Sequence, residues 1–284
     1  MPEMPELSGV THEWVDAGGL RTHVAFAGPE DAPPLLLVHG WPQHWYAWRH
    51  VIEALAGEYR IIAPDLRGHG WTDAPQGGYD KEQLATDVLA LLDALGLDKV
   101  TWVGHDWGAH TGYLAAYRAP ERFEHFVSLG MPPLFAAERS PALFFLLLGY
   151  QGPISTPFLG RFIVRHGFAG RILKIARAKG EWGPGEVAIY DDVFRARPHV
   201  TVGIYRTFLL REMLRIVLGR YLRQAFRVPL SIVVGDRDAI TRKVRPGAYP
   251  QRPEVPVTRL DGVGHFLMEE DPDGVVAAIR RARR

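Results

Sequence analysis

Unbroken runs of apolar residues are the feature of this 284-residue chain that most restricts its fold. A run such as PPLLLVHG (33–40) suits a strand that is buried on both faces, as in a parallel sheet. Similar runs recur along the chain, namely YRIIAPDL, KVTWVGHD, EHFVSLG, VPLSIVVGDRD and VPVTRLDGVGH. Between two of them, residues 81–96 carry leucines and a valine at helical spacing and end in a glycine. This alternation predicts an α/β fold with right-handed crossovers.

Two segments depart from the alternation. The sequence HEWVDAGGLRTHVAFAG (12–28) consists of two short runs around a Gly-Gly pair, which predicts a hairpin. Residues 132–226 contain helical, Arg-rich and aromatic-rich segments and no run typical of a buried strand. We therefore expect a core made of residues 1–131 and 227–284, into which residues 132–226 are inserted as a helical cap. Ligands of open α/β sheets bind at the carboxyl ends of the strands, so this cap would cover the site.

Composition excludes several classes of function. The chain has 33 Lys or Arg and 32 Asp or Glu, and a net charge of +1 does not favour a nucleic-acid partner. It has no cysteine, which excludes disulfides, a thiolate nucleophile and cysteine-based metal sites. The first residues, MPEMPELSG, are unlike a signal peptide, and the longest apolar run (142–150) is too short to span a bilayer. We expect a cytoplasmic monomer or homodimer with no nucleic-acid partner, no membrane partner, no metal and no cofactor.

The sequence VGHDWGAH places Asp106 between Gly104 and Gly108, directly after a predicted strand. A sharp strand-to-helix turn of the form G-x-S-x-G, called a nucleophile elbow, exposes a strained nucleophile. It needs small residues at the two flanking positions because strand and helix backbones pass close together. An aspartate after a strand also serves as a simple helix N-cap, so Asp106 alone leaves both interpretations open.

Two later residues favour the catalytic interpretation of Asp106. Asp238 and His265 follow the last two predicted strands, in the order nucleophile, acid, histidine. His265 is selected among twelve histidines because it lies between the last predicted strand and a final helix. Asp236 competes with Asp238 for the role of the acid; we favour Asp238 because it lies third after Gly235, beyond the strand end.

Five motifs give the chain a family resemblance. They are HGWP, DLRGHGWTDAP, GHDWG, GDRDAIT and GVGHFLMEEDP. Over nearly its whole length the chain resembles the α/β-hydrolase superfamily and, within it, the epoxide hydrolases. The resemblance implies a mostly parallel, eight-stranded sheet flanked by helices, with the inserted cap. It also implies an oxyanion hole formed by the backbone N–H groups of Trp41, in HGWP, and of Trp107, after the nucleophile.

A carboxylate in place of serine changes the class of substrate. Aspartate titrates near pH 4, so it is already ionised at neutral pH and can attack an electrophilic sp³ carbon without a general base. The product is an alkyl ester on Asp106, which water activated by His265 and oriented through Asp238 would hydrolyse. The resemblance therefore implies that a small apolar epoxide and water are converted to a vicinal diol.

An opened epoxide needs a proton donor, and a phenol can supply the proton. In epoxide hydrolases of this fold, two cap tyrosines point at the epoxide oxygen. The matching residues are Tyr150 in LLLGYQGP and Tyr205 in VGIYRTFL, with Tyr190 in reserve. Each of them also suits ordinary packing. Aromatic residues of the cap, including Phe158, Phe194 and Phe208, are candidates for lining an apolar pocket.

One other function stays open at this stage, and three more are disfavoured. A haloalkane dehalogenase uses the same aspartate nucleophile, with Trp107 and, in principle, the indole N–H of Trp41 holding the halide. Arginines that bind the carboxylate of fluoroacetate are replaced here by Trp107 and His110, and an esterase would need a serine at the elbow. A binding protein built on a hydrolase fold is disfavoured because the Asp–Asp–His set is intact.

Overall fold

The computed structural model describes residues 1–136, 149, 151–222, 224–245, 247, 249, 252 and 254–283. The described strands form one eight-stranded sheet in the order β1-β2-β4-β3-β5-β6-β7-β8. The strands are β1 (Thr11–Ala17), β2 (Leu20–Ala27), β3 (Pro34–Val38), β4 (Arg60–Pro64), β5 (Val100–His105), β6 (Phe123–Leu129), β7 (Leu230–Gly235) and β8 (Val257–Leu260). Strands β1 and β2 pair antiparallel, β2 joins β4 antiparallel, and all other pairs are parallel. The α/β prediction and the eight-stranded, mostly parallel sheet are confirmed.

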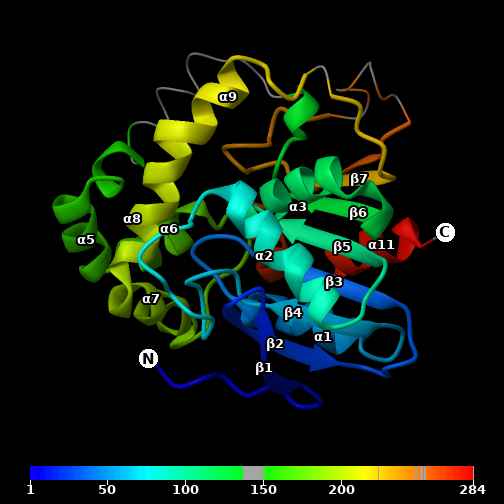
Figure 1. Cartoon of the computed structure of the whole chain (residues 1–284), viewed down its shortest axis with the longest axis horizontal. Coiled ribbons are helices and arrows are strands. Elements are labelled where there is room, and N and C mark those ends of the chain that lie inside the picture. Colours follow the sequence, from blue (N-terminus) through cyan, green and yellow to red (C-terminus); the bar gives the residue numbers. More distant parts are fainter. Residues whose placement is uncertain are drawn as a thin grey trace.

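Helices cover both faces of the sheet (Figure 1). They are η1 (Trp45–Trp48), α1 (Arg49–Leu55), α2 (Lys81–Ala94), α3 (Trp107–Arg118), η2 (Pro120–Arg122), η3 (Leu134–Ala136), α10 (Leu267–Glu270) and α11 (Pro272–Ala282). Alternate residues of β3 explain the two layers. Leu36 packs in the cluster that includes α2 and α3, whereas Leu35 packs in the cluster that includes α1 and α11. The unbroken apolar runs therefore arise because both faces of each central strand are buried.

Between β6 and β7 the chain forms helices that extend the molecule to one side of the sheet (Figure 1). They are α5 (Pro157–Arg165), α6 (Phe168–Ala176), α7 (Glu186–Ala196), α8 (Pro198–Thr207), the π-helical turn η4 (Phe208–Glu212) and α9 (Met213–Val217). Their buried side chains form a third apolar cluster, which also contains Trp41 and Trp107 of the sheet-forming part. The division of the chain into core and cap at residues 132 and 226 stays a prediction.

Candidate active site

Asp106 occupies the turn between β5 and α3, and its backbone is strained. With φ 49° and ψ −117°, it is the one non-glycine residue at positive φ among the described residues. Such a conformation costs of order 1–3 kcal/mol and persists only where the surrounding structure imposes it. A Cβ on Gly104 would lie 2.6 Å from the carbonyl oxygen of Gly108, and a Cβ on Gly108 would overlap the carbonyl oxygen of Val38. The two glycines therefore permit the close approach that holds Asp106 in this turn.

The carboxylate of Asp106 is surrounded by donors. The backbone N–H of Trp41 donates to Oδ2 at 3.1 Å, and the backbone N–H of Trp107 also hydrogen-bonds to this carboxylate. Nε2 of His265 lies 3.6 Å from Oδ1. One oxygen thus faces the N–H of Trp41 and the other faces the imidazole. The structure therefore brings together four of the residues that the sequence singled out, Asp106, Trp41, Trp107 and His265.

The second contact of His265 distinguishes Asp238 from Asp236. Nδ1 of His265 lies 3.3 Å from Oδ2 of Asp238, an ion-pair distance that is longer than a usual hydrogen bond. The hydroxyl of Thr241 donates to the same oxygen at 2.6 Å, and the N–H of Ile240 donates to Oδ1 at 2.9 Å. Asp236 makes no ion pair with any residue in the described part of the chain. Sequence analysis did not identify Thr241, although it lies three residues after Asp238.

The charges of Asp106, Asp238 and His265 shift one another's pKa values. Burial would lower the pKa of His265, but the carboxylate of Asp238 and the contact with Asp106 raise that pKa to about 10. Burial would raise the pKa of Asp106, but the contact with His265 and the charge of that residue lower it below its ordinary value. The pKa of Asp238 is lowered, since His265 and Thr241 outweigh the effect of burial. The resting site is therefore an imidazolium between two carboxylates.

The two predicted tyrosines that the structure describes, Tyr205 and Tyr190, lie in different places. Tyr205 is buried, and its ring packs edge-on against Trp41, with centroids 5.2 Å apart, and 6.0 Å from that of Trp107. Tyr150 lies outside the described residues. Tyr190 donates its hydroxyl to Oε1 of Glu269 at 2.6 Å and so belongs to another network. Of the two tyrosines predicted as proton donors, the structure thus places Tyr205 beside the Asp106 turn.

A buried ion pair, Lys81 with Glu212, lies beside the ring of Trp107. The ammonium of Lys81 is fully buried, 4.2 Å from the centre of the Trp107 ring, and donates to the carbonyl of Ile204 at 3.1 Å. Its partner is Glu212 in η4, with Nζ and Oε2 3.4 Å apart. Burial lowers the pKa of Lys81, while the charge of Glu212 opposes that effect. Sequence analysis missed this pair, because a lysine in the first turn of an amphipathic helix is normally solvated.

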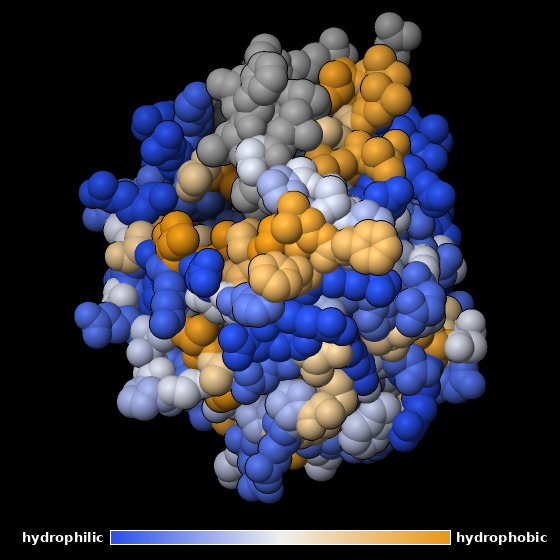
Figure 2. Space-filling model, turned by 90° about the vertical axis from the view of Figure 1, so that its left-hand side faces the viewer, coloured by the Kyte–Doolittle hydropathy of each residue, from blue (hydrophilic) through white to orange (hydrophobic). Residues whose placement is uncertain are grey.

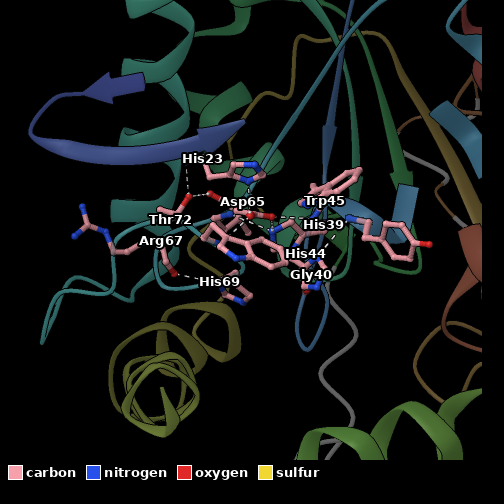
Figure 3. Close-up of polar contacts among 12 residues, drawn as sticks. His23, His39, Gly40, His44, Trp45, Asp65, Arg67, His69 and Thr72 are labelled. Carbon is pink, nitrogen blue, oxygen red and sulfur yellow. Dashed lines mark hydrogen bonds and ion pairs between the residues drawn. The ribbon is translucent and has the colours of Figure 1, made fainter. Parts of the chain in front are cut away.

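The loop that carries Trp41 is held by a buried carboxylate, Asp65, at the end of β4 (Figure 3). Oδ1 of Asp65 accepts the N–H of Trp45 at 2.8 Å, and Oδ2 accepts the N–H of Trp71 at 3.0 Å and faces Nδ1 of His23 at 2.7 Å. The Nε2 of His39, two residues before Trp41, accepts the N–H of Leu66 at 3.1 Å. The DLRGHG motif thus fixes the HGWP loop against the strand ends.

We expect Asp65→Asn to lower the free energy of unfolding by about 3 kcal/mol. The amide has one oxygen that accepts hydrogen bonds where the carboxylate has two, so one buried donor is left unpaired. Urea denaturation would measure the loss. Asp98→Asn is the matched control, since the side chain of Asp98 is exposed. Equal unfolding free energies for the two variants would contradict the role assigned to Asp65.

Two glutamates, four and five residues after His265, connect this region to the predicted cap. Oε1 of Glu269 accepts the hydroxyl of Tyr190, and Oε2 lies 2.8 Å from the guanidinium of Arg49. Oε2 of Glu270 accepts the N–H groups of residues 178 and 179, both at 2.8 Å, and that of Gly264 at 2.7 Å. The N–H of His265 itself donates to the carbonyl of Ala176, the last residue of α6, at 2.9 Å. The position of the histidine is therefore coupled to the end of a cap helix.

Two wider searches complete the description of the site. Within the described ranges, no group of three or more His, Cys, Asp or Glu side chains is arranged to hold a metal ion. Among the helices that the structure describes, none combines the length and the apolar character needed to cross a bilayer.

Comparison with known proteins places the chain in a family. A family profile for the alpha/beta hydrolase fold matches residues 33–159. Epoxide hydrolase A of Mycobacterium tuberculosis is 30% identical over 312 residues, covering 95% of this chain and 96% of that protein. The soluble epoxide hydrolase of Corynebacterium sp. is 46% identical over 124 residues, covering 44% of this chain and 43% of that protein. The crystal structure of epoxide hydrolase VrEH1 from Vigna radiata superposes with a TM-score of 0.80 at 27% identity, covering 97% of this chain and 98% of that one. This chain belongs to the epoxide hydrolase family within the alpha/beta hydrolase fold.

Proposed function

We propose that this protein hydrolyses epoxides to vicinal diols through a covalent ester on Asp106. The observation that carries the proposal is the geometry of the Asp106 carboxylate. Its Oδ2 is bound by the backbone N–H of Trp41, and its Oδ1 faces His265 without a close hydrogen bond. An ionised carboxylate held in a strained turn, with one oxygen less encumbered, is suited to attack carbon rather than to accept a proton.

In the first step, Oδ1 of Asp106 attacks a ring carbon, and the bond between that carbon and the epoxide oxygen breaks. The electron pair of the broken bond stays on the oxygen, which takes a proton from a phenol. Tyr205 is the described candidate for this donor, and Tyr150 is proposed as the second. The lowered pKa of Asp106 keeps the nucleophile ionised throughout the neutral range.

In the second step, water attacks Cγ of the ester and gives its proton to Nε2 of His265. The former Oδ2 becomes the oxyanion. The N–H of Trp41 donates to that atom, and the N–H of Trp107 is proposed as the second donor. Collapse of the intermediate breaks the bond between Cγ and Oδ1, and the leaving alkoxide takes the proton from His265. The diol thus leaves with the former Oδ1, and the oxygen of the attacking water restores the carboxylate. Esterification removes the charge of Asp106, one of the groups that raise the pKa of His265, so that pKa falls. The imidazolium can then release its Nε2 proton to solvent, which supplies the neutral imidazole that accepts the proton of the attacking water.

Apolar side chains around the two tryptophans support an apolar substrate. Phe194 packs edge-on against Trp41, with centroids 6.0 Å apart, and Phe208 lies 4.8 Å from Trp107. Phe158 does not belong to this group, because it is 89% exposed. The small apolar epoxide, the cytoplasmic location and the choice between monomer and homodimer stay predictions.

We expect Tyr205→Phe to lower kcat for epoxides by about 10- to 100-fold, because the alkoxide loses one of two proposed proton donors. Steady-state diol formation would measure the change. Tyr46→Phe is the matched control, since Tyr46 packs against Trp45 and Arg49 outside the site. An unchanged kcat in Tyr205→Phe would make this residue a packing residue.

Acid is expected to slow the second step before the first. Formation of the ester needs ionised Asp106, whose pKa is lowered, so this step continues as the pH falls toward about 4. Hydrolysis of the ester needs neutral His265, whose pKa Asp238 still raises after esterification. More ester should therefore accumulate at about pH 5 than at about pH 8, as measured by acid quenching and mass spectrometry of the intact protein. The opposite order would exclude His265 as the base.

Hydrolytic dehalogenation is the second candidate, because one observation favours it. The indole N–H of Trp107 is buried and has no hydrogen-bond partner among the described residues, so it is available to a halide. The other indole considered for that role is engaged, since Nε1 of Trp41 donates to the hydroxyl of Thr201 at 3.0 Å. A leaving halide would thus find one side-chain donor where two were expected.

A substrate panel separates the two candidates. The purified protein is incubated with styrene-type and aliphatic epoxides and, in parallel, with 1-haloalkanes and dihaloalkanes, with Asp106→Ala as the blank. Diol formation without halide release is the expected result. Halide release without diol would establish the second candidate and give Trp107 the central role. Neither product would overturn both.

A further inference from the structure

The outer side of the predicted cap carries large apolar side chains in contact with solvent. On α5, Phe158 is 89% exposed, Phe162 is 60% exposed, and Leu159 lies between them. Further along the chain, η4 and α9 expose Leu210 and Leu214. Figure 2 views the molecule from this side, and apolar side chains gather across its middle and again above it. We call these five residues the cap face.

The helices of the cap face are apolar on both sides. Gly160 and Val164 lie on the inner side of α5 and are buried, as expected for a packed helix. Phe158, Leu159 and Phe162 occupy positions where a surface helix of a soluble protein normally carries charged or polar groups. Phe158, Leu159 and Phe162 are close together on one helix, and such a group commonly marks a binding surface, whereas single exposed leucines need no explanation.

Exposed arginines accompany the apolar groups. Arg161 and Arg165 lie on α5, Arg206 on α8, Arg211 on η4 and Arg215 on α9. Within the part of the chain that the structure describes, the ion pairs found include none of these five. Their positive charges therefore face solvent, and Figure 2 shows hydrophilic residues on both sides of the apolar band.

The predicted cap as a whole, residues 132–226, is also positively charged. Residues 132–226 contain 14 Lys or Arg and 6 Asp or Glu, a net charge of +8. Because the whole chain has a net charge of +1, the remaining residues carry −7. The molecule is thus strongly dipolar, and an anionic surface would attract it with the cap face first.

Charge also decides which occupant suits the cap face. A second copy related by twofold symmetry would place one basic cap against another, and the like charges would repel. Docking of the cap onto the acidic remainder of another copy would be a head-to-tail contact that need not close. A bilayer with anionic head groups offers negative charge at its surface and an apolar interior just below it.

We propose that the cap face binds the surface of membranes that contain anionic lipids. Phe158, Leu159 and Phe162 insert among the head groups, while the neighbouring arginines contact lipid phosphates. The sequence argued against a membrane partner on the length of its apolar runs, and surface binding needs no spanning segment. The proposal is independent of the proposed reaction.

Co-sedimentation with vesicles tests the proposal. The full chain is mixed at low salt with vesicles of phosphatidylcholine and phosphatidylglycerol, and separately with pure phosphatidylcholine. Wild type should partition at least about tenfold more strongly to the anionic vesicles, and added salt should weaken that binding. Phe158→Ser/Phe162→Ser should reduce partitioning about tenfold or more. Arg161→Gln/Arg165→Gln should reduce it by a similar factor.

Matched substitutions on the other part of the molecule serve as controls. Trp14→Ser removes an exposed aromatic side chain from β1, and Lys243→Gln/Arg245→Gln removes two exposed charges outside residues 132–226. Both should bind vesicles like wild type, and every variant should keep the wild-type thermal midpoint. Asp106→Ala should also bind normally, which separates this proposal from the reaction.

Three results would overturn the proposal. They are absence of binding to anionic vesicles at low salt, equal binding to both kinds of vesicle, and equal losses in the cap-face and control variants. Sedimentation equilibrium without lipid adds a fourth test. A dimer that Phe158→Ser/Phe162→Ser dissociates would assign the cap face to a second copy of the chain instead.

Discussion

Asp106→Ala is expected to reduce turnover of epoxides by at least about 10⁴-fold, because no other group can form the covalent ester. The residue supplies both the attacking oxygen and the carbonyl that the oxyanion hole later binds. Binding of substrate should change much less, since the apolar surroundings of Trp41 and Trp107 are retained. Steady-state kinetics and a binding measurement with a non-reactive analogue would separate the two effects.

The stability of the Asp106→Ala variant is its control. The carboxylate is buried, so its removal also removes the cost of desolvating a charge and should leave the thermal midpoint unchanged or slightly higher. An inactive protein with a strongly lowered midpoint would indicate misfolding and not loss of a nucleophile. Turnover within about tenfold of wild type would rule out the covalent mechanism.

His265→Gln is expected to react once and stop. The carboxylate of Asp106 can still open the epoxide, but no base remains to activate water against the ester. Intact-protein mass spectrometry should show one adduct per chain, with a mass gain equal to the whole epoxide. A haloalkane would instead add its mass less that of hydrogen halide, so one spectrum also discriminates between the two candidate reactions.

The double variant Asp106→Ala/His265→Gln is the control for this trapping experiment, and it should form no adduct. Peptide mapping should place the adduct on the peptide that contains Asp106. Absence of any adduct in His265→Gln, while wild type turns over the same substrate, would contradict a covalent ester. An adduct on another residue would move the nucleophile away from the elbow.

Much of the sheet could be predicted because burial on both faces leaves a clear mark on the sequence. The run that became β3 is apolar throughout, since Leu35 and Leu36 pack against apolar neighbours on opposite faces of the sheet. The Asp106 turn could also be predicted from the sequence, because close backbone contacts require glycine at positions 104 and 108. These features depend on a few neighbouring residues.

Features that depend on distant parts of the chain were not predictable. Lys81 is buried because Glu212, more than a hundred residues later, neutralises it, and neither residue indicates the other in the sequence. Phe158 was a candidate for the pocket but is exposed, because a helix that is apolar on both faces does not reveal which face packs inward. The sequence favoured Asp238 over Asp236 by its place beyond the strand end, but the contact that distinguishes them depends on His265, which is distant in the sequence.

The hydrogen bond from His265 to Ala176 bears on how such enzymes can be engineered. Designers often exchange the segment above a conserved sheet to change specificity. Here a transplanted segment would have to supply a carbonyl at the end of its second long helix and two N–H groups for Glu270. Without them the histidine would lose its main-chain anchor. Chimeras should therefore retain residues 176–179 from the recipient chain, even where everything around them is replaced.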